Sequence, residues 1–190
     1  MKIYDALPNS VMVNGRKIRI NLAWQNVLKM LDVLSDEQLL PEAREYRAMK
    51  CICKHPKDGM CSAVLELLGF GNDKQDRQRI TDLDQDADMI RAAFMQTYGI
   101  NLYRDKLHWF EFTAFLSCIP EGSKYAEVLS IRARPIPEAN KYNAKEREWL
   151  IRAKAEYALK LSEKEREKQY SDNVKNIGAF LIALAGDGGK

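Results

Sequence analysis

An Asn-Gly pair near the N-terminus constrains the fold more than any other feature of the sequence. Asn14 and Gly15 separate two short runs of β-forming residues within the segment from Ser10 to Ile20. Both residues tolerate the positive φ angles of a two-residue type I′ turn, and apolar residues alternate with basic ones after the turn. The segment is therefore predicted to form a β-hairpin with one apolar face. Two strands alone are marginally stable in water, so a helix or a partner must cover that face.

The rest of the chain follows helical spacing. Apolar residues recur every three or four positions in several segments, and glycines or prolines end most of them. The segments expected to be helical are 24–34, 42–53, 60–68, 89–98, 105–116 and 123–134. Alternating acids at 82–88 precede the fourth helix, where the helix dipole favours negative charge, and we interpret them as helix-initiating surface residues. The predicted fold class is mainly α, a compact helical domain with an N-terminal β-hairpin and a long C-terminal helical extension.

The composition changes after residue 140. From Asn143 onward Ala, Glu, Lys and Arg dominate, which predicts a long exposed helix to about Gln169. A separate apolar segment follows at 177–185, and it must bury itself on the core or on another chain. We therefore expect a globular domain over 1–140 and a helical extension over 141–190. If the apolar segment binds a partner, the contact residues are Phe180, Leu181, Ile182 and Leu184.

The charge and the hydropathy of the chain argue against several classes of partner. Thirty Lys and Arg against 27 Asp and Glu give a net charge of +3 over 190 residues, and the signs are interspersed, which does not favour nucleic acid. Even the basic stretch 141–168 alternates with glutamates. No apolar run is long enough to span a bilayer, and the first residues lack the apolar stretch of a secretion signal. We expect a cytoplasmic protein with no membrane partner and with reduced cysteines.

One cluster has metal-ligand residue types, namely Cys51, Cys53, His55 and Cys61. Thiolates and imidazole suit zinc. On a helix, however, Cys51 and Cys53 point about 200° apart, which favours buried structural thiols instead. The acidic run lacks the glycine and the bidentate glutamate of a calcium loop, and no nucleophile motif or phosphate-binding glycine pattern is present. The sequence therefore predicts no enzyme and no cofactor, and His108 is read as a core-edge histidine beside Trp109.

Three blocks of residues carry a family resemblance. The first runs from Leu7-Pro8 through Val11-x-Val13-Asn14-Gly15 to Ile18-x-Ile20, the second contains Asp84-x-Asp86-Ala87, Ile90, Ala93-Phe94 and Tyr98-Gly99-Ile100, and the third is Leu107-His108-Trp109 with Phe112. The similarity continues through Ile131-Arg132 to Lys145-Glu146-Arg147. Together these blocks resemble the tailed-phage family named after gene product fifteen of Listeria-type siphophages. Leu83 and Phe110 stand where that family usually has a Trp and a second aromatic residue.

The resemblance implies a gene between those of the major tail protein and the tape-measure protein, the position of tail assembly chaperones. Such chaperones bind the long tape-measure chain, prevent its aggregation, recruit tail-tube subunits and leave before the virion is complete. The family has no catalytic residues to carry over. We therefore expect a non-enzymatic chaperone in the host cytoplasm that binds the tape-measure and major tail proteins, with Trp109, Phe112 and Phe115 in its core. A homo-oligomer, a structural tail component retained in the virion and a small nucleic-acid-binding regulator stay open as alternatives.

Overall fold

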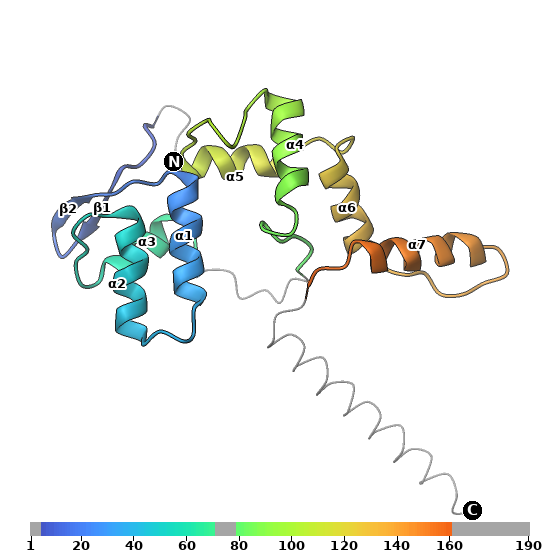
Figure 1. Cartoon of the computed structure of the whole chain (residues 1–190), viewed down its shortest axis with the longest axis horizontal. Helices are drawn as coiled ribbons and strands as arrows, with labels where there is room; N and C mark the ends of the chain where they lie inside the picture. The colour runs from blue at the N-terminus through green and yellow to red at the C-terminus, as the bar shows by residue number, and fades with distance from the viewer. Residues whose placement is uncertain (1–4, 71–78, 161–190) are drawn as a thin grey trace, which may run out of the picture. The chain divides into compact units, whose positions relative to one another are not determined.

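The computed structural model describes residues 5–70 and 79–160, and these residues form seven helices and one two-stranded hairpin (Figure 1). This architecture confirms the predicted mainly α fold with an N-terminal hairpin. The elements in chain order are β1 (Ser10–Val13), β2 (Arg16–Arg19), α1 (Trp24–Ser35), α2 (Pro41–Ile52), α3 (Met60–Leu67), α4 (Ala87–Tyr98), α5 (Trp109–Ser117), α6 (Lys124–Ala133) and α7 (Ala144–Glu156).

The contacts within the chain divide it into two units. The first unit contains Met1–Arg79 and Ala87–Glu127, and the second contains Ile80–Asp86 and Val128–Lys190. The division into a globular domain over 1–140 and an extension over 141–190 stays a prediction. No described helix has the length and apolar character needed to cross a membrane.

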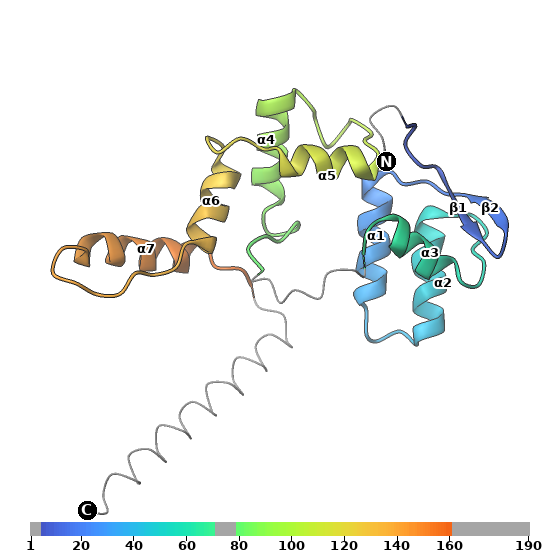
Figure 2. The same cartoon turned by 180° about the vertical axis from the view of Figure 1, so that it is seen from behind.

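The N-terminal hairpin forms as predicted. β1 and β2 pair antiparallel, and the turn residues Asn14 and Gly15 have φ angles of 49° and 74°. Positive φ at both positions is what a type I′ turn requires. Val11 and Val13 are buried on one face of the hairpin, and α3 lies against β1 in both views (Figures 1 and 2). The helix α3 thus supplies the cover that a two-stranded sheet needs.

The helices α1, α2 and α3 form one part of the core of the first unit. The helices α1 and α2 lie side by side and are joined by a short connection (Figure 1). Their facing residues include Val27 and Met30 from α1 and Met49 from α2, all at most 2% exposed. Val64 of α3 is also fully buried. The three- and four-residue spacing seen in the sequence therefore corresponds to buried helix faces.

Aromatic rings join α1, α4 and α5. Phe112 stacks on Trp24 with ring centroids 4.8 Å apart and on Phe94 at 5.5 Å. Trp109 is buried as predicted, whereas Phe115 is only half-buried and contacts Phe94 at the edge of the cluster, at 6.3 Å. Offset and edge-to-face pairs of this kind add to the stability gained by burial alone.

The start of α5 differs from the prediction. The helix begins at Trp109, not at Asp105. Asp105 instead accepts a hydrogen bond from the backbone N–H of Asn101 at 2.7 Å, and His108 caps the helix. The capping geometry, not the first acidic residue, sets the helix start.

The end of α7 also differs from the prediction. The expectation of a helix to about Gln169 was wrong, because α7 ends at Glu156. The next residues bond to side chains from elsewhere in the second unit: the Tyr157 carbonyl accepts from Arg132 Nε at 2.6 Å, and the Ala158 carbonyl accepts from Gln85 Nε2 at 2.8 Å. These bonds hold the backbone in a non-helical path.

Candidate functional site

Asp86 and Arg132 form a buried ion pair in the second unit. Arg132 Nη1 donates to Asp86 Oδ2 at 2.7 Å, and Nη2 donates to Oδ1 at 2.8 Å, so the pair is bidentate. The side chain of Asp86 is 0% exposed and that of Arg132 is 7% exposed. Burial by itself raises the pKa of Asp86, but the hydrogen bonds from Arg132 and from the Asp82 backbone outweigh it and leave that pKa below its usual value.

The remaining polar atoms of the pair also have partners. Asp86 Oδ2 accepts from the backbone N–H of Asp82 at 3.0 Å. Arg132 donates to the carbonyl oxygens of Ile80 and Tyr157 at 3.1 and 2.6 Å. A buried charge pair is tolerated when its hydrogen bonds are satisfied in this way. The pair therefore ties segment 80–86 to α6 and to the residues after α7.

This arrangement corrects the interpretation of the acidic run as surface charge. Asp86 is fully buried, whereas Asp84 and Asp88 lie at or near the surface. The two partners are 46 positions apart in the chain, and nothing in the local sequence links them. Both residues lie in segments that carry the family resemblance, Asp84-x-Asp86-Ala87 and Ile131-Arg132. This was the only feature of the sequence that could have linked the two positions. Their role is structural, because both charged groups are fully committed to each other and to the backbone.

His108 also has a structural place. Its Nδ1 accepts from the backbone N–H of Phe110 at 3.3 Å, so the ring proton is assigned to Nε2, which donates to the Pro8 carbonyl at 2.9 Å. The backbone N–H of His108 donates to Glu111 Oε2 at 2.8 Å, completing a capping box. Both ring nitrogens are thus in use. The histidine connects the first and third resemblance blocks and is not available as a base.

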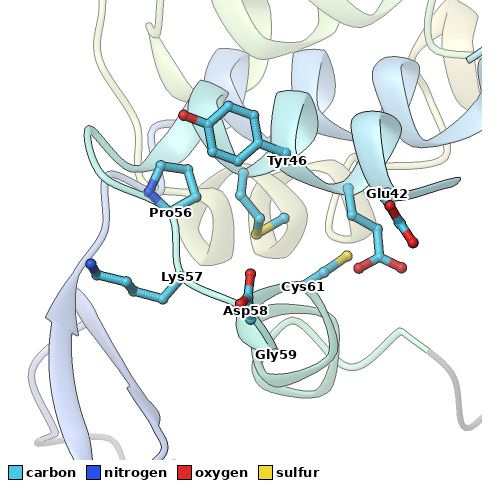
Figure 3. A pocket seen from close by; sticks show the side chains of 9 residues that line it. Glu42, Tyr46, Pro56, Lys57, Asp58, Gly59 and Cys61 are labelled. Atoms are coloured by element: carbon cyan, nitrogen blue, oxygen red, sulfur yellow. The ribbon is translucent and has the colours of Figure 1, made fainter. Parts of the chain in front are cut away.

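A small pocket opens between α2 and α3 (Figure 3). Its volume is about 170 Å³. Figure 3 shows Tyr46 and Pro56 on one side and Glu42 and Cys61 on the other, with Lys57 extending away from them. The full lining is Glu42, Glu45, Tyr46, Met49, Pro56, Lys57, Asp58, Gly59 and Cys61. The pocket combines exposed carboxylates with the buried side chain of Met49.

Cys61 is the reactive side-chain type in this pocket, and its environment keeps it protonated. Burial raises the pKa of the Cys61 thiol, and the negative charge of Glu45 raises it further. The thiolate is the form that attacks electrophiles and binds metals. The raised pKa lowers the thiolate fraction of Cys61 at neutral pH.

The predicted zinc candidates do not come together. Cys53 and Cys61 are buried, Cys51 is half-buried and His55 is exposed. The Sγ atom of Cys51 lies 3.6 Å from the Arg47 carbonyl, within its own helix. Across the described part of the chain, no three Cys, His, Asp or Glu side chains are grouped as metal ligands. Cys53 and Cys61 are thus buried as structural thiols would be, whereas Cys51 is only half-buried.

The second unit carries a concentration of exposed apolar side chains. Of the ten large apolar side chains that are exposed among the described residues, four fall within sixteen positions: Ile136, Tyr142, Trp149 and Ile151. Trp149 is 50% exposed and Tyr142 is 97% exposed. Trp149 and Ile151 come from α7, whereas Ile136 and Tyr142 come from the connection before it.

Two further predicted features concern the C-terminal part of the chain. The partner-binding residues Phe180, Leu181, Ile182 and Leu184 lie outside the described residues. Within the described part of the basic stretch, Arg152 pairs with Glu148 at 2.9 Å. Basic and acidic side chains therefore alternate on this part of α7, and the expectation that the chain does not bind nucleic acid stays a prediction.

Comparison with known proteins identifies one matching protein family. A family model described as Bacteriophage Gp15 protein matches residues 3–159. No curated protein and no solved structure matches the chain.

Proposed function

Because the chain belongs to the Bacteriophage Gp15 protein family, we propose that it acts in phage tail assembly as a chaperone for the tape-measure and tail-tube proteins. The family match is the observation that carries this proposal, since it covers 157 of the 190 residues, from 3 to 159. The resemblance of the same blocks to siphophage gene product fifteen adds the expected gene position beside the tape-measure gene. The proposed place of action is the host cytoplasm, where tails are assembled.

The surface of the second unit supports a binding role. A chaperone for a long aggregation-prone chain needs apolar groups that its client can reach. Ile151 provides such a group on α7. The apolar segment 177–185 provides more, and we propose that Phe180 and Leu181 enter a groove of the client in the manner of a helix in a groove.

The proposed role is non-enzymatic. The candidate histidine is committed to a helix cap, and the buried thiol of Cys61 is held in its protonated form. Within residues 5–70 and 79–160, neither feature has the partner that nucleophilic catalysis requires. Binding is the activity that these surfaces support.

The proposal is tested by co-expression of the full chain with the tape-measure and major tail proteins of its own genome. We expect the tape-measure protein to become soluble and to co-purify with this chain. The variant Phe180→Asp/Leu181→Asp should lose this effect, whereas the matched variant Gln169→Asp/Ser171→Asp, which adds the same charge at polar positions, should keep it. A tape-measure protein that stays insoluble with the wild-type chain contradicts the chaperone role.

A second measurement separates the chaperone from a structural tail component. Chaperones leave the assembly, so mass spectrometry of purified virions should find none of this protein or only traces. Recovery in stoichiometric amounts with the tail-tube subunit would instead identify it as a structural component of the tail.

A further inference from the structure

The helix α7 is only partly covered. Leu150 is fully buried and packs with Ile131 and Ala153, whereas Trp149 and Ile151 remain 50% and 40% exposed. Successive residues of a helix are about 100° apart, so Trp149 and Ile151 lie on opposite flanks of the buried stripe. The second unit thus leaves an apolar side chain uncovered on each flank of α7.

The two flanks differ in what lies beside them. Arg147 is on the Ile151 side by helical position, and its Nε donates to the Pro137 carbonyl at 3.3 Å. The connection 134–143 runs alongside α7 in both views (Figures 1 and 2). The connection therefore lies toward the Ile151 flank, and Trp149 remains half-exposed on the other flank.

The buried apolar cluster of the second unit is small among its described residues. Its described residues, 80–86 and 128–160, have a buried apolar cluster of Ile131, Leu150 and Ala153, with Tyr157 packed against it. The four cysteines are free, and none of them lies in segment 80–86 or in 128–160, so no disulfide supports this cluster. Apolar cover on the Trp149 flank would therefore add to a small core.

The sequence contains a segment of matching chemistry in the same unit. Residues 177–185 include Phe180, Leu181, Ile182 and Leu184, with no charged residue among them. Sixteen residues separate this segment from Lys160, and such a tether reaches about 50 Å when extended. The helix α7 has 13 residues and is about 20 Å long, so the segment can return to it. A tether of this kind holds the segment at an effective concentration on the order of millimolar.

We propose that the apolar segment 177–185 folds back onto the Trp149 flank of α7 in the free protein, with Phe180 and Leu181 against the Trp149 ring. This contact covers the exposed indole and enlarges the small core of the second unit. It involves no second protein, and it stands or fails separately from the proposed role in tail assembly.

Hydroxyl-radical footprinting of the full chain tests the contact, because the oxidation rate of a tryptophan follows its exposure to solvent. In the wild type, the fold-back should leave Trp149 oxidised slowly, and Phe180→Asp/Leu181→Asp should raise that rate several-fold. The buried Trp109 is the internal reference, and its unchanged rate shows that the first unit remains folded. The matched variant Gln169→Asp/Ser171→Asp should behave as the wild type.

Two outcomes overturn the proposal. Equal Trp149 oxidation in the wild type and in the Phe180→Asp/Leu181→Asp variant means that the segment does not cover the flank. Protection of Trp149 that disappears on tenfold dilution means that a second copy of the chain covers it instead.

A second experiment changes Trp149 and measures the effect on the segment 177–185. Trp149→Glu should release the segment, so amide hydrogen exchange in peptides covering 177–185 should become several-fold faster. Tyr142→Glu is the matched control, since it places the same charge on another exposed aromatic residue of the second unit. Exchange that is equally fast in the wild type and in Trp149→Glu also overturns the proposal.

Discussion

A single buried ion pair joins the segments of the second unit. Asp86 and Arg132 are both buried and joined by two hydrogen bonds, next to an apolar cluster of only a few side chains. Removal of one partner leaves the other as an uncompensated buried charge, which costs about 3–5 kcal/mol. Asp86→Ala should therefore accelerate amide exchange throughout α7, while exchange in α1 of the first unit serves as the reference.

A double variant separates two effects of Asp86→Ala: the loss of the attraction between Asp86 and Arg132, and the unpaired buried charge of Arg132. In Asp86→Ala/Arg132→Met no charge remains buried, so exchange in α7 should be slower than in Asp86→Ala alone. If the double variant is no better than the single one, the bonds from Arg132 to the carbonyls of Ile80 and Tyr157 matter more than the ion pair.

The same pair predicts a dependence on pH. The pKa of Asp86 is lowered in the folded protein, so the folded state favours the ionised carboxylate. Its contribution to stability is fully present above the unfolded pKa of about 3.9 and is lost as the pH falls through the lower folded value. Exchange in α7 should accelerate as the solution is acidified below about pH 4, the ordinary range of an aspartate. Asp86→Asn should remove this acid step, and a step that persists in that variant would assign it to another carboxylate.

At the scale of elements, the sequence predicts turns and helix ends that depend on the residue type at one or two positions. The Asn14-Gly15 turn and the left-handed Gly99 after α4, with a φ angle of 68°, were both foreseeable from residue type. The start of α5 was missed although its capping box of His108 and Glu111 is local, because a histidine is not among the usual N-cap residues. The end of α7 was missed because it depends on a distant side chain, since the Tyr157 carbonyl accepts from Arg132, 25 positions away.

The cap of α5 yields a prediction at this scale. His108→Ala removes the acceptor for the Phe110 N–H and the donor to the Pro8 carbonyl. Loss of an N-cap side chain costs about 1 kcal/mol, and the carbonyl loses its partner in addition. His108→Asn should recover the cap but not the bond to Pro8, so its thermal midpoint should lie between those of the wild type and His108→Ala. Equal midpoints for the two variants would show that the cap contributes nothing.

At the scale of the whole molecule, the candidate binding surface could be predicted only in part. Composition indicated an apolar C-terminal segment that must be covered, with its own core and a partner both left open. The sequence did not single out Trp149 on α7, because Ala, Glu, Lys and Arg dominate the stretch around it. Its burial depends on how much of α7 the rest of the second unit covers, and periodicity alone does not specify that.

The fold-back and the proposed client binding use the same side chains, so they must compete. A segment that is docked about nine-tenths of the time binds a client with about tenfold weaker apparent affinity, because only the free fraction is competent. Trp149→Glu should therefore bind the tape-measure protein more tightly than the wild type, as measured by titration of the purified chain against a soluble tape-measure fragment. Tyr142→Glu should leave the affinity unchanged. Weaker binding by Trp149→Glu would mean that Trp149 itself contacts the client, and α7 would then belong to the client-binding surface instead of restraining it.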